Sequence, residues 1–215
     1  MSGPRSNSAR RVATLIDRLA RLSRELQFAE GLNPAQWEAL RFLAQANAQS
    51  RTPGAVAEYL GATKGTASQT LIALENKGLI RRARCMADKR QRDLAITEAG
   101  EALLTKDPIH TLGLAADELA DEDCHALVRG LTRLLHDVQR AHGVRTFGVC
   151  ADCSLQCVEE APSLAGSLRG GSQLRCGLTG EPIDPQRADR LCINFAPLAD
   201  EAPRNRRAAG DDGAD

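Results

Sequence analysis

Residues 62–100, ATKGTASQTLIALENKGLIRRARCMADKRQRDLAITEAG, decide the fold of this chain. Thr63 is a suitable helix N-cap, and apolar residues then recur at helical spacing at Ala67, Leu71 and Leu74. Gly78 stands where a glycine commonly ends a helix. The opposite face carries short polar or basic side chains, which suit base edges and phosphates. We therefore predict a recognition helix whose DNA-contacting residues are Thr63, Lys64, Thr66, Ser68, Gln69 and Thr70.

Two short strand-like segments follow, residues 79–84 and 93–96, separated by a polar tip. A hairpin this short cannot bury many cations, so its basic residues must face solvent or a polyanion. An isolated run of charged residues is usually a solvated surface. Because this basic hairpin directly follows a helix with a polar face, we favour DNA binding. The basic residues are Arg81, Arg82, Arg84, Lys89, Arg90 and Arg92; the predicted DNA contacts among the hairpin residues are Arg84, Asp88, Lys89, Arg90 and Arg92.

The segment LGATKGTASQTLIALENKGLIRRARCMADKRQRDLAITEAGEALL, residues 60–104, resembles the winged helix-turn-helix core of MarR-type transcriptional regulators. The hairpin and the residues after it are similar to the family pattern D-x-R…L-x-L-T-x-x-G-x-x-L. The resemblance covers roughly residues 10–142. It implies that Arg90 enters the minor groove and that Asp88 helps to hold it, whereas the plainer interpretation of Arg90 is a charge at a hairpin tip. The matching residues are Asp88, Lys89, Arg90, Leu94 to Thr97, Gly100 and Leu103.

Composition favours a mainly helical protein with a small β-wing. The chain has 215 residues, 42% of them hydrophobic and only 3% aromatic, so its core must consist of Leu, Ala, Val and Ile. Net charge is zero but unevenly placed: residues 1–147 carry 21 Lys and Arg against 17 Asp and Glu, and residues 148–215 carry 7 against 11. The basic excess therefore lies with the predicted DNA-binding part.

Two long amphipathic segments flank this core. A heptad-like apolar stripe runs through the first, and a second apolar stripe lies on a helical run predicted over residues 116–142. Each stripe could pack within its own domain, but in MarR-like folds the first and last helices form the dimer interface, so the resemblance implies a homodimer. The first stripe is Val12, Leu15, Leu19, Leu22 and Leu26; the second is Leu127, Leu131, Leu134, Leu135 and Val138.

Local signals mark the other helix boundaries. Asn33 and Thr52 each precede a proline and are expected to cap helices, Thr97 is expected to cap another, and a break is expected near residues 107–108. Trp37 is expected in the core. We divide the chain into a flexible N-terminal tail (1–9), a winged helix-turn-helix and dimerisation domain (10–143), a cysteine-rich segment (144–198) and a disordered tail (199–215).

Most of the cysteines lie in residues 144–198, and their interpretation depends on the compartment in which the protein works. The first ten residues contain no apolar run, which predicts no signal peptide, and no stretch is apolar enough to span a membrane, so we expect a cytoplasmic protein that does not bind membranes. In a reducing compartment, cysteines are more often metal ligands or redox thiols than disulfide partners. Cys85 and Cys124 stand apart and are read as incidental.

Residues 144–198 have too few large apolar side chains to form a core of their own, so a thiolate-bound metal is expected to hold them together. Cys150 and Cys153 form a CxxC pair, and isolated cysteines follow after 22 and then 15 intervening residues. Zinc ribbons usually have two CxxC pairs, so the irregular spacing favours an iron–sulfur cluster, with zinc as the alternative. The predicted ligands are Cys150, Cys153, Cys176 and Cys192, with Cys157 as a substitute thiol; the C-x15-C segment also resembles cysteine-rich tails of some MarR-like proteins.

Three hypotheses follow. The first is a homodimeric, sequence-specific regulator that binds double-stranded DNA at near-palindromic operators and responds to redox state or metal through the cluster. The second keeps DNA binding, makes a zinc ion purely structural, and places a small aromatic effector between the dimer helices and the winged domain. The third is a thiol–disulfide enzyme, which is weak because no βαβ pattern surrounds the CxxC pair and because no phosphate loop, nucleophile elbow or HExxH motif is present. We expect no enzyme.

Overall fold

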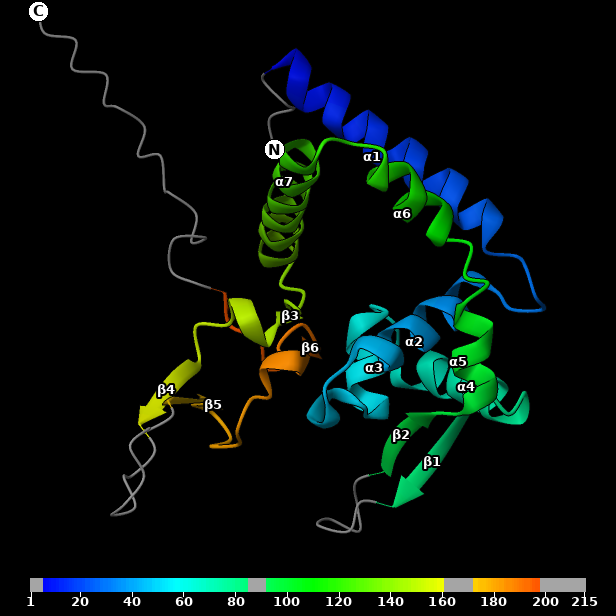
Figure 1. Ribbon diagram of the computed structural model, residues 1–215. Helices are drawn as coiled ribbons and strands as arrows, with labels where there is room; N and C mark the ends of the chain where they lie inside the picture. The colour runs from blue at the N-terminus through cyan, green and yellow to red at the C-terminus, as the bar shows by residue number, and fades with distance from the viewer. Residues whose placement is uncertain (1–5, 85–91, 161–171, 198–215) are drawn as a thin grey trace, which may run out of the picture.

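The computed structural model describes residues 6–84, 92–160 and 172–197. Helices and the β-wing follow one another in the order expected of a winged helix-turn-helix (Figure 1). The elements up to the wing are α1 (Asn7–Leu26), α2 (Pro34–Gln45), η1 (Ala48–Ser50), α3 (Pro53–Tyr59), α4 (Lys64–Asn76), β1 (Ile80–Arg84) and β2 (Arg92–Ile96). Those after it are α5 (Glu98–Leu104), α6 (His110–Asp117), α7 (Asp121–Ala141), β3 (Gly148–Val149), η2 (Cys150–Asp152), β4 (Gln156–Glu160), β5 (Ser172–Cys176), η3 (Pro185–Arg187) and β6 (Leu191–Cys192).

The predicted helix starts are confirmed. Asn33 caps α2 in a complete capping box with Gln36, and the side chains of Thr52, Thr63 and Thr97 each accept a backbone N–H of the first turn of α3, α4 and α5. These caps satisfy N–H groups that a helix leaves free at its start. They therefore fix where the two helices of the helix-turn-helix begin.

The α4 helix and the wing are joined by a tight turn. Gly78 follows the last residues of α4 with φ +69°, a conformation that favours glycine because it has no Cβ. The strands β1 and β2 then pair antiparallel, from Ile80 opposite Ile96 to Arg84 opposite Arg92. Both strands agree with the sequence-based expectation to within one residue.

The core lies where α2, α3, α4 and the wing meet. Trp37 is completely buried, as predicted, together with the apolar faces of α2 and α4. The largest fully buried side chains are Trp37, Phe42, Leu40, Leu43, Leu71, Leu74, Ile80, Leu94 and Val56.

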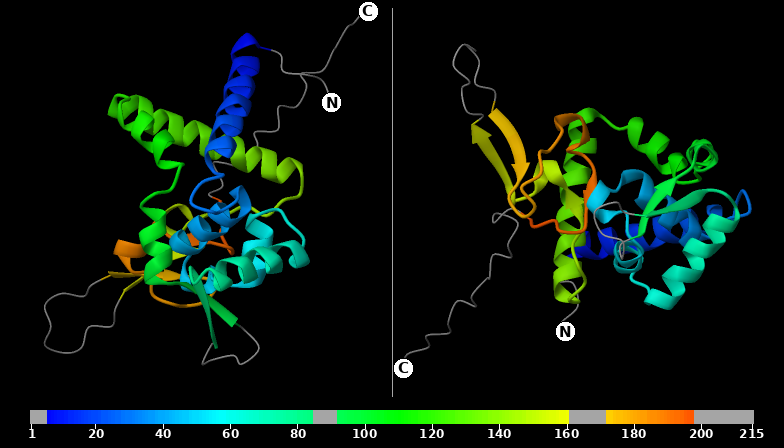
Figure 2. Two further views of the ribbon diagram at one scale, coloured as in Figure 1. Left: turned by 90° about the vertical axis from the view of Figure 1, so that its right-hand side faces the viewer. Right: turned by 90° about the horizontal axis from the view of Figure 1, so that it is seen from below.

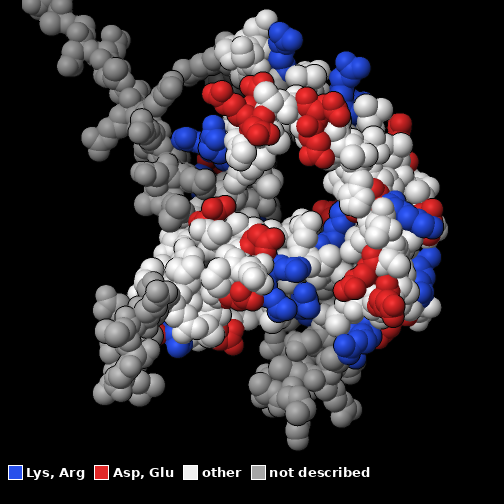
Figure 3. Space-filling model, in the orientation of Figure 1, with Lys and Arg blue, Asp and Glu red and all other residues white. Residues whose placement is uncertain are grey.

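The helical run predicted over residues 116–142 is interrupted. It forms the short α6, a turn at residues 118–120 and the longer α7. The acidic residues Asp121, Glu122 and Asp123 lie in the first turn of α7, where the partial positive charge of a helix N-terminus stabilises them. Figure 3 shows acidic side chains gathered around this end of the helix.

Helices α1, α6 and α7 form an arch over the winged-helix body, and the space-filling view shows an opening beneath it (Figures 1 and 3). No residue of α1 is buried, and the predicted stripe on that helix is exposed, with Leu22 at 57%. The stripe on α7 is also exposed, including Leu131 and Leu135. Large exposed apolar faces of this kind commonly mark protein–protein contacts.

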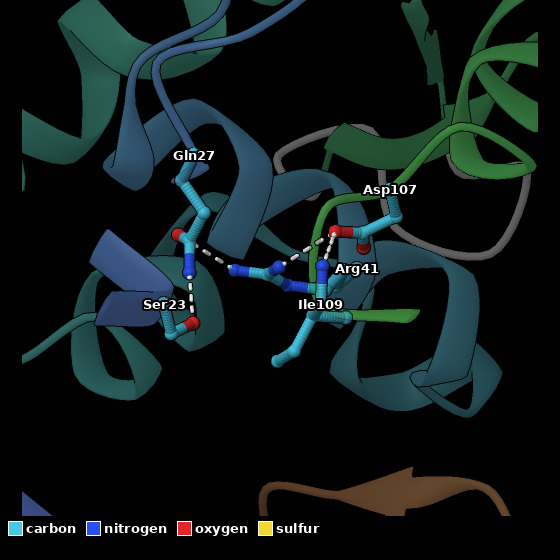
Figure 4. A network of polar contacts seen from close by, with 5 residues as sticks. All are labelled: Ser23, Gln27, Arg41, Asp107 and Ile109. Carbon is cyan, nitrogen blue, oxygen red and sulfur yellow. Dashed lines mark hydrogen bonds and ion pairs between the residues drawn. The ribbon is translucent and has the colours of Figure 1, made fainter. Parts of the chain in front are cut away.

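A polar network joins the arch to the body (Figure 4). Arg41 of α2 lies 3.0 Å from a carboxylate oxygen of Asp107 and donates to the Gln27 side chain at the end of α1. Gln27 in turn donates to Ser23, and the Asp107 carboxylate accepts the Ile109 N–H just before α6. Asp107 is only 4% exposed, so this ion pair is a buried anchor for the arch where α1 ends and α6 begins.

The cysteine-rich segment is not a separate appendage. Phe147 packs edge-on against Phe42 and Tyr59, and Leu191 and Ile193 pack on the same core. Two small antiparallel pairs, β3 with β6 and β4 with β5, build the segment, and the β4–β5 hairpin extends from the body in a different direction from the wing (Figure 2). Within the described residues, none of the helices combines the length and the apolar character needed to cross a bilayer.

Candidate nucleic-acid interface and thiol pocket

The exposed face of α4 carries four of the six predicted contact residues. Ala67, Leu71 and Leu74 are buried against the body. Because of the helical period, the other side of α4 faces solvent, and the exposed side chains there are Thr63, Lys64, Thr66 and Gln69. Lys64 supplies a cation for phosphate, and Gln69 an amide that can pair with a base edge.

Several hydroxyls of this face already serve the helix itself. The Thr63 side chain accepts the Thr66 N–H at 3.1 Å, and the Thr70 hydroxyl donates to the Thr66 carbonyl at 3.1 Å. Ser68 and Thr70 are only half-exposed. The Thr66 hydroxyl also lies 3.0 Å from that of Thr63. The geometry therefore makes Lys64 and Gln69 the predicted contacts whose polar groups are best placed to meet DNA.

The base of the wing is fixed to α4. Arg82 of β1 forms a 3.0 Å ion pair with Glu75, whereas Arg81 is exposed. Arg84 and Arg92 are opposite each other at the last described rung of the hairpin. The predicted wing contacts Asp88, Lys89 and Arg90, and also Cys85, lie outside the described residues.

A pocket of about 410 Å³ lies where the cysteine-rich segment meets the loop between α2 and α3. Cys150, Cys176 and Cys192 line it, although they come from three separate elements. Burial and then the nearby Cys192 raise the pKa of the Cys150 thiol, and Cys153 and Cys176 act in the same direction against a hydrogen bond from Asn47. The four predicted ligands are therefore close enough to interact electrostatically.

Each of the four sulfurs has N–H groups directed at it. The Asn194 N–H lies 3.3 Å from the Cys192 sulfur, and the Ala196 N–H lies 3.5 Å from that of Cys153. Asn47 Nδ2 lies 4.0 Å from the Cys150 sulfur. Burial tends to raise the pKa of Cys176, but hydrogen bonds from Thr179 and from the Leu178 backbone lower it overall. Donors of this kind favour the thiolate, which is the form that binds metals.

Cys157 differs from these four. It is exposed, and its thiol donates a hydrogen bond to the Arg175 carbonyl at 3.4 Å. Neither Cys157 nor the predicted ligand Cys153 lines the pocket. Its exposure thus sets Cys157 apart from the four predicted ligands.

Three arginines line the same pocket. Burial, followed by the charges of Arg190 and Arg187, lowers the pKa of Arg51, so these guanidinium groups repel one another. Glu181 and Asp184 offset part of this charge, and Arg187 lies 3.8 Å from Asp184. The remaining positive charge favours an anionic occupant, such as a cluster with four thiolates.

The spacing of the thiols bears on which metal fits. Among the described residues, no three His, Cys, Asp or Glu side chains are placed to share a single ion. A tetrahedral zinc site with bonds near 2.3 Å needs sulfurs about 3.8 Å apart. As they stand, the described thiols therefore do not form a single-ion site.

The arginines and Asn47 were not predicted from the sequence. Asn47 lies 103 residues before Cys150, and Arg190 donates to the Ala44 carbonyl at the end of α2. No local motif connects positions so far apart. Arg187 and Arg190 lie close to Cys192 in the sequence, but the region around the cysteines carries no excess of basic residues that would single them out.

Comparison with known proteins gives one family. The model of the MarR family matches residues 30–91, which span α2, α3, α4 and β1. Similar solved structures include the MepR–DNA complex of S. aureus (20% identity, 62% of this chain and 99% of that chain, TM-score 0.47). Another is FabT of Streptococcus pneumoniae in complex with DNA, with 21% identity over 62% of this chain and 96% of that chain and a TM-score of 0.49. A third is BldR of Sulfolobus solfataricus, with 22% identity over 63% of this chain and 99% of that chain and a TM-score of 0.49. In its winged-helix part, residues 30–91, the chain is thus similar to the MarR family.

Proposed function

We propose that this protein is a homodimeric, sequence-specific DNA-binding transcription regulator and not an enzyme. The observation that carries the proposal is α4, an N-capped helix that follows a short helix and a turn, buries one apolar face and exposes Lys64, Thr66 and Gln69. The match of residues 30–91 to the MarR family supports it. In a helix-turn-helix, such a second helix enters the major groove. The expected place of action is the cytoplasm, away from membranes.

The dimer part of the proposal is supported by the exposed apolar stripes of α1 and α7. A helix of 20 residues with no buried side chain gains little from its own domain and needs a partner surface. A second copy of the chain would supply the same two stripes by symmetry. Such a dimer would place two recognition helices on half-sites about 34 Å apart, so the operator should be near-palindromic.

We also propose that the pocket binds an iron–sulfur cluster through Cys150, Cys153, Cys176 and Cys192, and that its redox state or occupancy shifts the DNA-binding equilibrium. Support comes from the convergence of the four thiols, their N–H donors and the three arginines. The cluster, when bound, supplies one-electron redox chemistry. The protein contributes the thiolates, the positive charge and the contact with the winged-helix body.

DNA binding is tested by fluorescence anisotropy on operator and scrambled duplexes over a salt series. We expect Lys64→Ala and Arg90→Ala to weaken binding to both duplexes and to reduce the salt slope by about one each, because each loses a phosphate or minor-groove contact. Gln69→Ala should instead reduce the preference for the operator. An affinity for DNA that is the same across the salt series for all three variants would contradict the proposal.

The metal is tested by anaerobic purification, an absorbance scan and analysis of iron, sulfide and zinc. A brown protein with iron and acid-labile sulfide supports the cluster. A colourless protein with about one zinc per chain, as in a four-thiolate site, would overturn it. The response would then have to come from a small aromatic effector bound beneath the arch, with the zinc purely structural.

A further inference from the structure

The loop between α2 and α3, residues 46–51, touches three parts of the molecule at once. We call it the connector. It contains the short η1 helix, capped by Asn47, whose Oδ1 accepts both the N–H and the hydroxyl of Ser50 at 3.0 and 2.6 Å. The connector ends directly before Thr52, the cap of α3.

On one side the connector is hydrogen-bonded to the cysteine-rich segment. The Asn47 N–H donates to the Leu191 carbonyl at 2.8 Å, and the Ile193 N–H donates to the Ser50 hydroxyl at 2.8 Å. These bonds lie immediately before and after Cys192 in the chain. Ser50 is fully buried, so its bond to Ile193 is shielded from water.

On the other side the connector is hydrogen-bonded to strand β2 of the wing. The Leu94 N–H of β2 donates to the Arg51 carbonyl at 2.7 Å, and Leu94 itself is buried. The Arg51 side chain also donates to the Ala46 carbonyl at 3.2 Å, which closes the connector on itself. A displacement of Arg51 would therefore reach both the wing and the beginning of α3.

The connector also forms one wall of the thiol pocket. Asn47 directs its amide nitrogen at the Cys150 sulfur, and Arg51 lines the pocket with Arg187 and Arg190. We propose that Asn47 and Arg51 contact the bound cluster, and that the connector transmits the occupancy of the pocket to the wing and α3. This inference rests on the proposed function of the same site.

The direction of the effect follows from the charges. A filled pocket brings negative charge among the three arginines and holds Arg51 in place. An empty pocket leaves the guanidinium groups repelling one another. Among the three arginines, Arg51 is the one whose backbone carbonyl accepts the hydrogen bond from Leu94 of the wing. Emptying the pocket should therefore loosen the Leu94–Arg51 bond and change the affinity for DNA.

Two variants test the role of the connector. Asn47→Asp keeps the Oδ1 atom that accepts from Ser50, but removes the N–H donor to Cys150 and adds a negative charge. Arg51→Met removes the cation and keeps most of the aliphatic stem. The control is Gln45→Asp, which also turns an amide into a carboxylate, with a side chain one methylene shorter, at an exposed position outside the pocket.

Full-length protein is compared with cluster loaded and after removal of iron by a chelator. We measure the cluster reduction potential, the operator affinity of both forms and hydrogen exchange at the Leu94 amide. We expect both variants to lower the reduction potential of the cluster. The operator affinity of the loaded protein divided by that of the stripped protein should also move at least about threefold closer to one in both variants. Gln45→Asp should match the wild type in both measurements. Faster exchange at Leu94 after stripping the wild type is also expected.

The outcomes separate the two proposals. A wild type without iron, or without operator binding, would refute the proposed function itself. A wild type whose DNA affinity depends on the cluster, with both connector variants indistinguishable from Gln45→Asp in potential and affinity ratio, would refute only the role of the connector. Circular dichroism of each variant establishes that it is folded; if one variant unfolds, the other decides the question.

Discussion

Replacing Asp107 with alanine should destabilise the protein by about 3–5 kcal/mol, because it leaves a mostly buried charge without its partner. The Arg41 side chain is only 14% exposed and Asp107 is 2% exposed at its side chain, so water cannot replace the lost carboxylate. Figure 4 shows that the same carboxylate also faces the N–H of Ile109. Asp107→Ala removes both interactions at once.

Matched variants separate charge from hydrogen bonding. Asp107→Asn keeps an oxygen for both Arg41 and Ile109 and should cost less, about 1–3 kcal/mol, the range for weakening one buried hydrogen bond to a charged group. The double variant Arg41→Met with Asp107→Leu removes both charges and should recover much of the loss, since buried ion pairs can often be replaced by apolar residues.

The assay is urea unfolding followed by circular dichroism, at one fixed protein concentration because a dimer is more stable when concentrated. A cost below about 1 kcal/mol for Asp107→Ala would fall in the range of surface ion pairs. Such a value would show that the network does not anchor the arch, and the argument from its burial would fail.

Three further results are expected. Gly100→Ala should cost about 1–3 kcal/mol in urea unfolding, because a Cβ there would lie 2.2 Å from the Leu79 carbonyl oxygen; no loss would mean that α5 shifts freely. Leu131→Glu should convert the dimer to monomer in sedimentation experiments, because a charge on the exposed α7 stripe cannot be buried at the interface; an unchanged dimer would place the interface elsewhere. Cys153→Ser should lose most of the iron while Cys157→Ser retains it, by metal analysis; equal retention would contradict the proposed ligand set.

Much of the winged-helix part could be predicted because its signals are local. Caps at Asn33, Thr63 and Thr97 depend on a side chain and an N–H three residues apart, so the sequence displays them directly. The boundary between α6 and α7 was missed because helical periodicity continues across the turn. Asp121, Glu122 and Asp123 lie in the first turn of α7, and acidic residues at such a position are a local signal of a helix start.

The thiol pocket was only half predictable. Spacing and clustering single out four cysteines as candidate ligands, and the structure places Cys150, Cys176 and Cys192 around one pocket. The wall formed by Asn47 and Arg51 depends on the path of the chain through the core, where Phe147 and Leu191 dock on the winged-helix body. Such long-range packing leaves no periodic signal in the sequence.

The position of the pocket also bears on how it could control DNA binding. Three residues after Cys192, the Phe195 ring packs against the buried His136 of α7, with ring centroids 5.5 Å apart. The ring also packs closely on Gly148, where a Cβ would lie 2.5 Å from it. The segment that hydrogen-bonds to the connector at Leu191 and Ile193 is thus also held against the helix that carries the second apolar stripe. In the proposed dimer the spacing of the two recognition helices would depend on α7, so a pocket that is lined by the connector and linked to α7 through Phe195 would act on both.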